Sequence, residues 1–182
     1  MTLAHVQSLV PDLHVVEAAP QEDEAALEQL GLWCTRYSPL VTPNPPDGVF
    51  IDVAGSAHLF KGETALLRDI ASRLATAGIN AKVAVADTPG CAWAVARYSS
   101  ESIVAPGRIA DALGGLPVSA LRISQKTVES LHDVGIERIA HLATKPRSTL
   151  QTRFGSELLL RLDHALGQPT KLSQIGCGNR RM

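Results

Sequence analysis

SPLVTPNPPDGVFIDVAG, residues 38–55, is the stretch that decides which fold we expect. Leu40–Thr42 and Val49–Val53 are rich in the β-branched and apolar residues typical of strands. Between them NPPDG, residues 44–48, combines two prolines with a glycine and predicts a turn. The stretch therefore predicts a β-hairpin.

Helices and further strands are predicted on both sides of this hairpin. Upstream, we expect a short helix ending at Pro11, a strand through Leu13, Val15 and Val16, and a helix over residues 21–37. Downstream, apolar side chains at helical spacing predict a helix over residues 63–77. A strand over 80–86, a helix opened by Pro89 and a short strand at SIVA, residues 102–105, follow. This order predicts an α+β fold, with a sheet covered by helices on one face.

The character of the chain changes at Pro106. Gly114 and Gly115 interrupt residues 106–116, and Pro117 follows them, so we interpret residues 106–116 as a linker after a first region over residues 1–105. Beyond the linker, residues 117–167 predict a small all-α module with helices near 125–133, 139–143, 148–153 and 157–167. Residues 168–182 show no periodicity, and we expect an irregular tail.

VESLHDVGIERIAHLATKP, residues 128–146, is the clearest local signal of the module. Gly135 lies between two short apolar-patterned helices, as in a helix-hairpin-helix. The second helix of such a hairpin can hold a DNA phosphate without reading a base. The candidate DNA-binding residues are Gly135, Ile136, Arg138, Lys126 and Lys145, with Arg147 and Arg153 nearby. The alternative is a structural hairpin that contacts no DNA.

Composition narrows the function classes. The 17 basic and 18 acidic residues nearly balance, so bulk charge gives no support for attraction to nucleic acid or to an anionic membrane. Cys34, Cys91 and Cys177 are odd in number and far apart, which predicts neither a zinc site nor a disulfide framework and fits a reducing cytoplasm. We find no signal peptide and no apolar stretch long enough to cross a bilayer.

Several short motifs resemble Y-family (UmuC/DinB-type) DNA polymerases, and within them the ImuB-like branch. CTRYSPLVTPNPPDGVFIDVAG, residues 34–55, resembles the palm hairpin, and residues 58–98 resemble the helix, strand and helix that follow it. LPVSALRI, residues 116–123, together with the helical module resembles the family's thumb. The resemblance covers residues 1 to about 170. It implies a partial ferredoxin-like palm followed by a thumb-like helix-hairpin-helix module, in a chain truncated at both ends.

The resemblance also implies which catalytic groups are missing. Active members hold magnesium with carboxylates. Here the family's aspartate falls on Asp47, whereas Gly48 replaces the neighbouring glutamate. Cys91 and Val95 replace two lysines near the incoming triphosphate. We therefore expect no catalytic residue, no metal site and no cofactor.

As in the ImuB-like branch, the resemblance implies a non-catalytic, cytoplasmic protein of DNA damage tolerance and translesion synthesis. Its expected partners are DNA, a replicative-type polymerase, the sliding clamp and a RecA-like protein, with no membrane partner. Two other hypotheses remain open. The chain is a fragment of an active polymerase whose magnesium ligands lie upstream of residue 1, or it is a relic without function.

Other candidate sites are weaker. Asp47 and Asp52 are five residues apart across a turn and a strand, so we do not expect them to share a metal ion. His58 has no second ligand at a suitable spacing. QLGLW, residues 29–33, resembles a clamp-binding peptide but lies in a predicted helix, so we expect Leu30 and Trp33 in the core.

Overall fold

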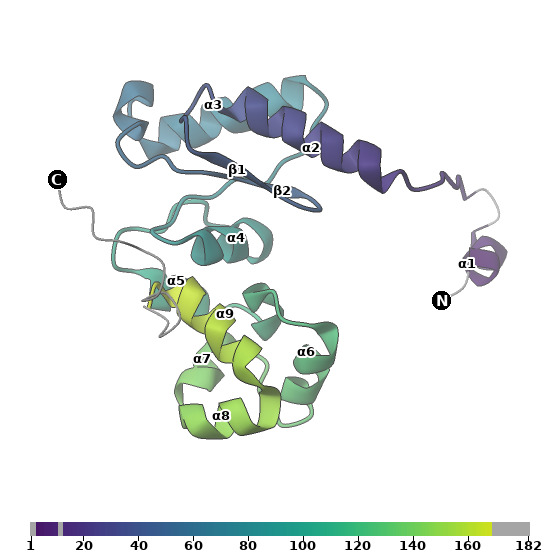
Figure 1. Cartoon of the computed structure of the whole chain (residues 1–182), viewed down its shortest axis with the longest axis vertical. Helices are drawn as coiled ribbons and strands as arrows, with labels where there is room; N and C mark the ends of the chain where they lie inside the picture. Colours follow the sequence, from purple (N-terminus) through teal and green to yellow (C-terminus); the bar gives the residue numbers. More distant parts are fainter. Residues whose placement is uncertain (1–2, 11–12, 169–182) are drawn as a thin grey trace. The chain divides into compact units, whose positions relative to one another are not determined.

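A computed structural model describes residues 3–10 and 13–168 of the 182-residue chain (Figure 1). Those residues divide into two compact units between Ser56 and Ala57. The first unit contains α1 (Leu3–Leu9), α2 (Pro20–Cys34), β1 (Val41–Asn44) and β2 (Gly48–Ile51). The second contains the 3₁₀ helices η1 (Ala57–Phe60) and η2 (Val118–Leu121) and seven α-helices. These are α3 (Glu63–Thr76), α4 (Pro89–Tyr98), α5 (Ile109–Gly114), α6 (Gln125–His132), α7 (Ile139–Ala143), α8 (Arg147–Phe154) and α9 (Ser156–Leu166).

The first unit is built on the predicted hairpin, which is confirmed with shifted strand ends. β1 and β2 pair antiparallel, with Val41 opposite Ile51 and Asn44 opposite Gly48. Helix α2 packs on β1 through a close approach at Gly31, where an added Cβ would lie 2.9 Å from Cγ of Pro43. Glycine is therefore required at this position of α2.

Three predicted strands are wrong. Residues 13–19 have no regular secondary structure, although Leu13, Val15 and Val16 predicted a strand there. Residues 80–86 and 102–105 form only an isolated parallel bridge between Val85 and Ile103. A strand exists only where a neighbour pairs with its N–H and C=O groups, and that neighbour is not visible in local sequence. In the part of the chain that the structure describes, the bridge is all the pairing these segments receive.

The predicted helices are confirmed, with small changes at their ends. The helix expected over residues 21–37 spans Pro20–Cys34, and the one expected over 63–77 spans Glu63–Thr76. All four helices expected after residue 117 are present as α6 to α9. The fold class is α+β, as predicted, with helices predominating over a two-stranded sheet.

The core of the second unit lies among α4 to α9 and η2. Helix α9 follows α8 after Gly155 and contacts α8, α4, α5 and η2 (Figure 1). The largest fully buried side chains of this core include Leu113, Leu131, Leu142 and Leu158. The predicted linker, residues 106–116, contains α5, whose Leu113 is fully buried. Whether residues 1–105 and 117–167 act as separate domains stays a prediction, and the expected tail lies almost wholly outside the described residues.

Helices α4 and α9 meet without intervening side chains. An added Cβ on Gly90 would lie 2.8 Å from Cα of Ala165. The hydroxyl of Thr88 donates a 2.7 Å hydrogen bond to the carbonyl oxygen of Ala165 and accepts a 3.1 Å bond from the amide of Cys91. Thr88 therefore caps the first turn of α4 and satisfies a carbonyl in the last turn of α9.

Across the described residues, none of the helices is long and apolar enough to cross a membrane.

The α4–α9 contact predicts the effect of a larger residue at position 90. Gly90→Val should lower the free energy of unfolding by about 1–3 kcal/mol, because its side chain would force two backbones apart. Gly115→Ala is the matched control, since Gly115 has an ordinary φ of −77° and nothing within 4 Å of an added Cβ. Thermal unfolding followed by circular dichroism measures both. Equal melting temperatures for the two variants would contradict the contact.

The sparse pairing of the predicted palm strands predicts uneven stability along the chain. We expect the chain to fold poorly by itself, because strand edges left open expose backbone groups that invite pairing between chains. Limited proteolysis should cut first within residues 1–105, and residues 117–167 should persist longest. Mass spectrometry of the fragments checks this order. A single sharp melt of the full chain as a soluble monomer would contradict it.

Candidate nucleic-acid interface

The hairpin between α6 and α7 has the tight turn that its glycine predicts. Gly135 has φ of +74°, a conformation that side chains disfavour. Its amide donates to the carbonyl oxygen of His132, and the amide of Ile136 donates to that of Leu131, both at 2.9 Å. This pattern is the Schellman motif, and Leu131 and Ile136 are both buried in the core. The two turn amides are therefore engaged inside the hairpin.

The start of α7 is tied to the segment before η2. Val118 donates its amide to the carbonyl oxygen of Glu137, and Ile139 donates to that of Leu116, each at 3.0 Å. The guanidinium of Arg138 donates to the carbonyl oxygen of Gly115. Arg138 therefore already donates a hydrogen bond to the protein backbone, although its side chain is largely exposed.

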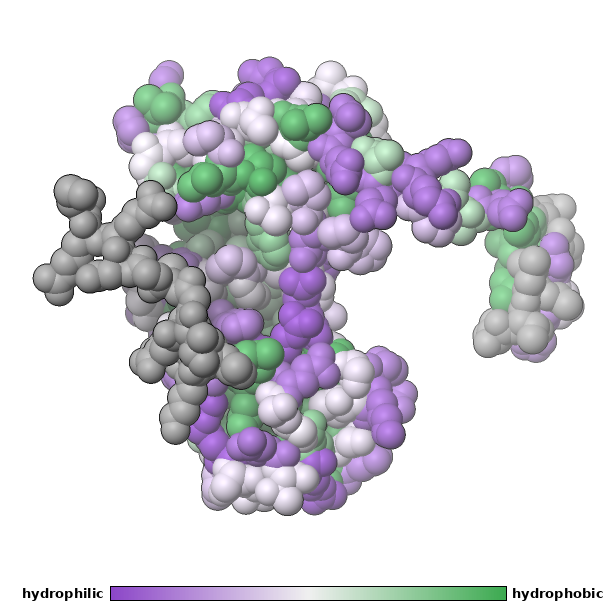
Figure 2. Space-filling view, in the orientation of Figure 1, coloured by the Kyte–Doolittle hydropathy of each residue, from purple (hydrophilic) through white to green (hydrophobic). Residues whose placement is uncertain are grey.

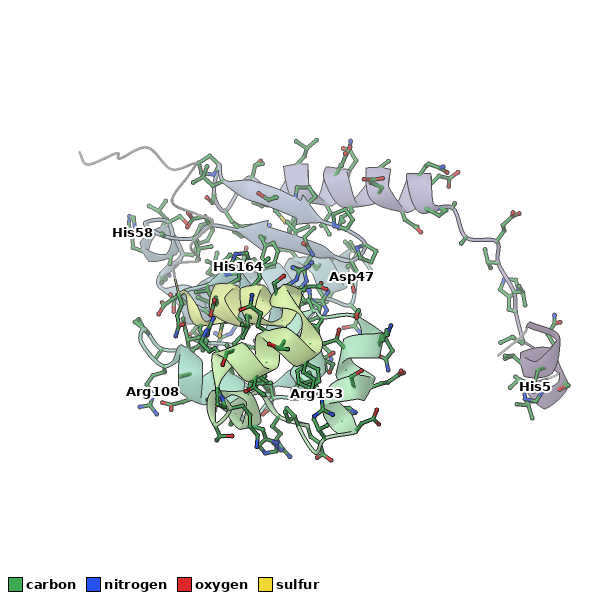
Figure 3. All side chains as sticks on the ribbon, turned by 60° about the horizontal axis from the view of Figure 1, so that its bottom comes forward. His5, Asp47, His58, Arg108, Arg153 and His164 are labelled. Carbon is green, nitrogen blue, oxygen red and sulfur yellow. The ribbon has the colours of Figure 1, made fainter. Side chains whose placement is uncertain are left out.

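The other positively charged side chains of the module differ in the contacts that they make. Arg147 donates from Nη2 to both carboxylate oxygens of Asp163, at 2.8 and 2.6 Å, and joins α8 to α9. Arg153 lies over the ring of Phe154, 5.6 Å from its centroid, at the end of α8 (Figure 3). Lys126 and Lys145 are exposed, and neither forms an ion pair with any residue that the structure describes. The two lysines and Arg153 are therefore the side chains best placed to meet a phosphate.

Charge is divided between the two units, which the near-neutral total conceals. Residues 1–56 hold eight acidic residues and a single basic one, Arg36, a net charge of −7. Residues 57–182 hold ten acidic and sixteen basic residues, a net charge of +6. Figure 2 shows hydrophilic surface over the early turns of α2, where the acidic residues Glu22, Asp23 and Glu24 lie. Attraction to a polyanion is thus expected from the second unit alone. Counting charges along the chain would have revealed this.

The two aspartates of the palm-like hairpin lie at opposite ends of β2. Asp47 lies in the turn before β2, and Asp52 follows its last residue (Figure 3 labels Asp47). The five positions from Asp47 to Asp52 correspond to about 16 Å of extended chain, too far for the two carboxylates to share one ion. The carboxylate of Asp52 accepts a 2.9 Å bond from the amide of Ala54. Among residues 3–10 and 13–168, moreover, no three His, Cys, Asp or Glu side chains gather as metal ligands.

The positions that correspond to the family's lysines lie inside the core. Cys91 and Val95 are 0% and 1% exposed on the buried face of α4. Burial, helped by the charge of Asp87, raises the pKa of the Cys91 thiol to about 11. Burial also raises the pKa of Cys34. Neither thiol is therefore suited to act as a nucleophile. Cys177 lies outside the described residues.

The structure also shows where the weaker candidate sites, His58 and QLGLW, lie. His58 is exposed in η1. QLGLW lies inside α2 as predicted, but Leu30 and Trp33 are only half-buried, and the fully buried positions of the helix are Leu27, Gly31 and Cys34. The expectation that Leu30 and Trp33 form core was therefore too strong.

One cluster was missed by sequence reasoning. Trp93 lies in contact with the guanidinium groups of both Arg97 and Arg122. The i, i+4 spacing of Trp93 and Arg97 on a predicted helix could have indicated the first contact. The second joins residues 29 positions apart, which no local pattern reveals.

Comparisons with known proteins extend this description. The model of the impB/mucB/samB family matches residues 1–97, more than half of the chain. Protein ImuB of Caulobacter vibrioides is 44% identical over 165 residues, which cover 90% of this chain and 36% of that protein. DNA polymerase IV of Shewanella oneidensis is 25% identical over 173 residues, which cover 92% of this chain and 48% of that protein. The chain thus spans between a third and a half of these relatives.

Solved structures share the fold at lower identity. DinB from Sulfolobus solfataricus superposes with a TM-score of 0.75 at 19% identity, over 92% of this chain and 52% of that one. An insertion ternary complex of Dbh DNA polymerase gives a TM-score of 0.73 at 19% identity, over 94% and 52% of the two chains. The order of hairpin, helices and helical module is therefore that of one stretch of these polymerases. By its sequence and its fold, the chain belongs to the impB/mucB/samB family as a Y-family, ImuB-like protein.

Proposed function

We propose that this chain serves DNA damage tolerance as a polymerase-like protein that binds DNA without carrying out polymerisation. The observation that carries the proposal is Gly48, which stands where active members have a carboxylate next to Asp47. A glycine offers no side-chain oxygen to a magnesium ion, and Asp52 lies at the far end of β2. The family membership and the 44% identity to Protein ImuB support the assignment to damage tolerance.

The proposed DNA contact is weak and independent of sequence. Lys126, Lys145 and Arg153 are exposed side chains on or beside α6 to α8, and phosphate oxygens are their natural partners. Glu129, Asp133 and Glu137 lie on the same hairpin and reduce its net positive charge. Gly135 and Ile136 contribute by shaping the turn rather than by donating to DNA. The helix-hairpin-helix thus acts through its side chains.

The proposal also covers the cellular location and the protein partners of the chain. A cytoplasmic location fits the resemblance and the free, buried Cys34 and Cys91. A replicative-type polymerase, the sliding clamp and a RecA-like protein are the proposed protein partners.

The absence of polymerisation is tested by primer extension. The purified chain, given a primed template, the four deoxynucleotides and magnesium or manganese, should not lengthen the primer, because the carboxylate at position 48 is missing. An active DinB-type polymerase serves as the control. Extension by this chain alone would contradict the proposal. Extension only by a version that starts upstream of residue 1 would favour the fragment of an active polymerase.

DNA binding is tested by fluorescence anisotropy with a labelled duplex at several salt concentrations. The affinity should fall steeply with salt. The double substitution Lys126→Gln and Lys145→Gln should reduce the slope of log K against log salt by about 1.8, or about 0.9 for each phosphate that a lysine no longer neutralises. Glu129→Gln and Glu137→Gln form the matched control and should strengthen binding. A lysine variant with unchanged affinity and slope would contradict the proposed binding by these side chains.

The shape of the turn is tested at Gly135. Gly135→Val forces a β-branched residue to a φ of +74° and should weaken DNA binding several-fold by moving α7. Circular dichroism shows whether the variant is still folded. If a folded Gly135→Val variant binds as tightly as the parent, the hairpin is structural only.

A further inference from the structure

The hairpin of the first unit has one edge whose backbone groups are unpaired. The amide of Asp52 donates to the carbonyl oxygen of Leu40 at 2.9 Å, which makes these two residues a hydrogen-bonded pair of the antiparallel ladder. Such pairs alternate with non-hydrogen-bonded ones, so Ile51 and Val49, the latter opposite Pro43, turn their N–H and C=O groups away from β1. In the part of the chain that the structure describes, no third strand pairs with these groups. We call them the open β2 edge.

A second unpaired edge lies in the second unit, along residues 82–86. Val85 forms both hydrogen bonds of the parallel bridge to the segment of Ile103, at 2.8 and 2.9 Å. Successive residues of an extended segment turn their backbone groups to opposite sides, so those of Ala84 and Ala86 point away from this bridge. Neither alanine forms a backbone hydrogen bond with any residue that the structure describes. We call these groups the 82–86 edge.

Apolar side chains accompany both edges and are incompletely covered. Val49 and Ile51 share the face of the hairpin that packs on α2, because their partners on β1 lie within 4 Å of a Cβ added to Gly31. Both side chains are nevertheless only half-buried. Val83 and Val85 are also half-buried, on the side of their segment away from the two alanines that pack against the core. Parallel pairing of the two edges would set valines beside Val49 and Ile51 and remove apolar surface from water.

Charge complementarity selects the strand that fits the open β2 edge. This edge lies in the first unit, whose net charge is −7, between Asp47 and Asp52 at the two ends of β2. The 82–86 edge lies in the second unit, whose net charge is +6, and begins with the exposed Lys82. Residues 14–16 also have side chains suited to a strand, but they belong to the acidic unit and would meet like charge.

We propose that the open β2 edge pairs in parallel with the 82–86 edge of a second copy of this chain. The partner is a second copy because every copy carries one edge of each kind, with opposite charge around them. The register that matches the outward-facing groups sets Val85 opposite Ile51 and brings Lys82 beside Asp47. Two copies that exchange both contacts form a closed dimer, and single contacts form longer assemblies. This self-association is independent of the proposed DNA binding.

Sedimentation velocity of the full chain at several protein and salt concentrations tests the proposal. The chain should associate into dimers or larger species as its concentration rises. Added salt should weaken the association, because it screens the opposite charges of the two edges. A chain that stays monomeric at every concentration would overturn the proposal. Association that salt leaves unchanged or strengthens would indicate unspecific apolar contact and would overturn it as well.

Val49→Pro tests the backbone pairing. Proline removes the outward N–H at position 49 and keeps the hydrogen bonds between β1 and β2, as Pro43 does at the opposite position. The variant should remain folded by circular dichroism and raise the dissociation constant about tenfold, the effect of one lost hydrogen bond with its desolvated partner. Val49→Thr is the matched control, since it keeps the N–H and the β-branched shape. Equal association of Val49→Pro and Val49→Thr would overturn the proposal.

Lys82→Glu tests the second edge without altering the hairpin. It places like charges beside each other and should raise the dissociation constant about tenfold. Arg68→Glu is the matched control, because it makes the same change of net charge at an exposed position of α3 in the same unit. It should weaken association far less. Equal effects of the two substitutions would mean that net charge, and not the 82–86 edge, drives association, and the proposal would be wrong.

Discussion

Helices α4 and α9 approach each other at Gly90, where the backbone of Ala165 occupies the space that a side chain would need. The hydroxyl of Thr88 bonds to both helices at the same point. On one side of this contact, α4 carries Trp93 and Arg97. On the other, α9 holds Asp163, which receives Arg147 and so positions α8. The arrangement of the cations in the second unit therefore depends on two backbones meeting without a side chain between them.

Much of the fold follows from local sequence, and the exceptions have a common cause. The hairpin at residues 41–51 and helices α6 and α7 are set by turn residues and apolar spacing within a few positions, so they could be predicted. The strands expected at residues 13–16 and 80–86 have equally suitable residues but lack an extensive hydrogen-bonding neighbour among the described residues. Strand formation is a property of pairs of segments, which a single segment does not reveal.

In the candidate site, too, some features could be predicted from local sequence and others could not. The sequence identified Gly135 and the exposed Lys126 and Lys145, because turn glycines and lysines are recognisable one at a time. It could not show that Arg138 is bonded to the carbonyl oxygen of Gly115, because that contact joins residues 23 positions apart. The Schellman bonds of the turn amides join residues only three and five positions apart, so the turn glycine could have indicated them. Because the amides of Gly135 and Ile136 are bonded within the turn, the proposed phosphate contacts come from side chains.

The Schellman motif at Gly135 has an evolutionary consequence. The residues that form the turn, Leu131, Gly135 and Ile136, are separate from those that determine its surface charge, such as Lys126 and Glu137. Substitutions at the exposed positions can change the attraction of the hairpin to a polyanion without disturbing its backbone. A scaffold of this kind can gain or lose ligand affinity in single mutational steps while its stability stays nearly constant. Ligand affinity and the backbone of the turn can thus change separately in this module.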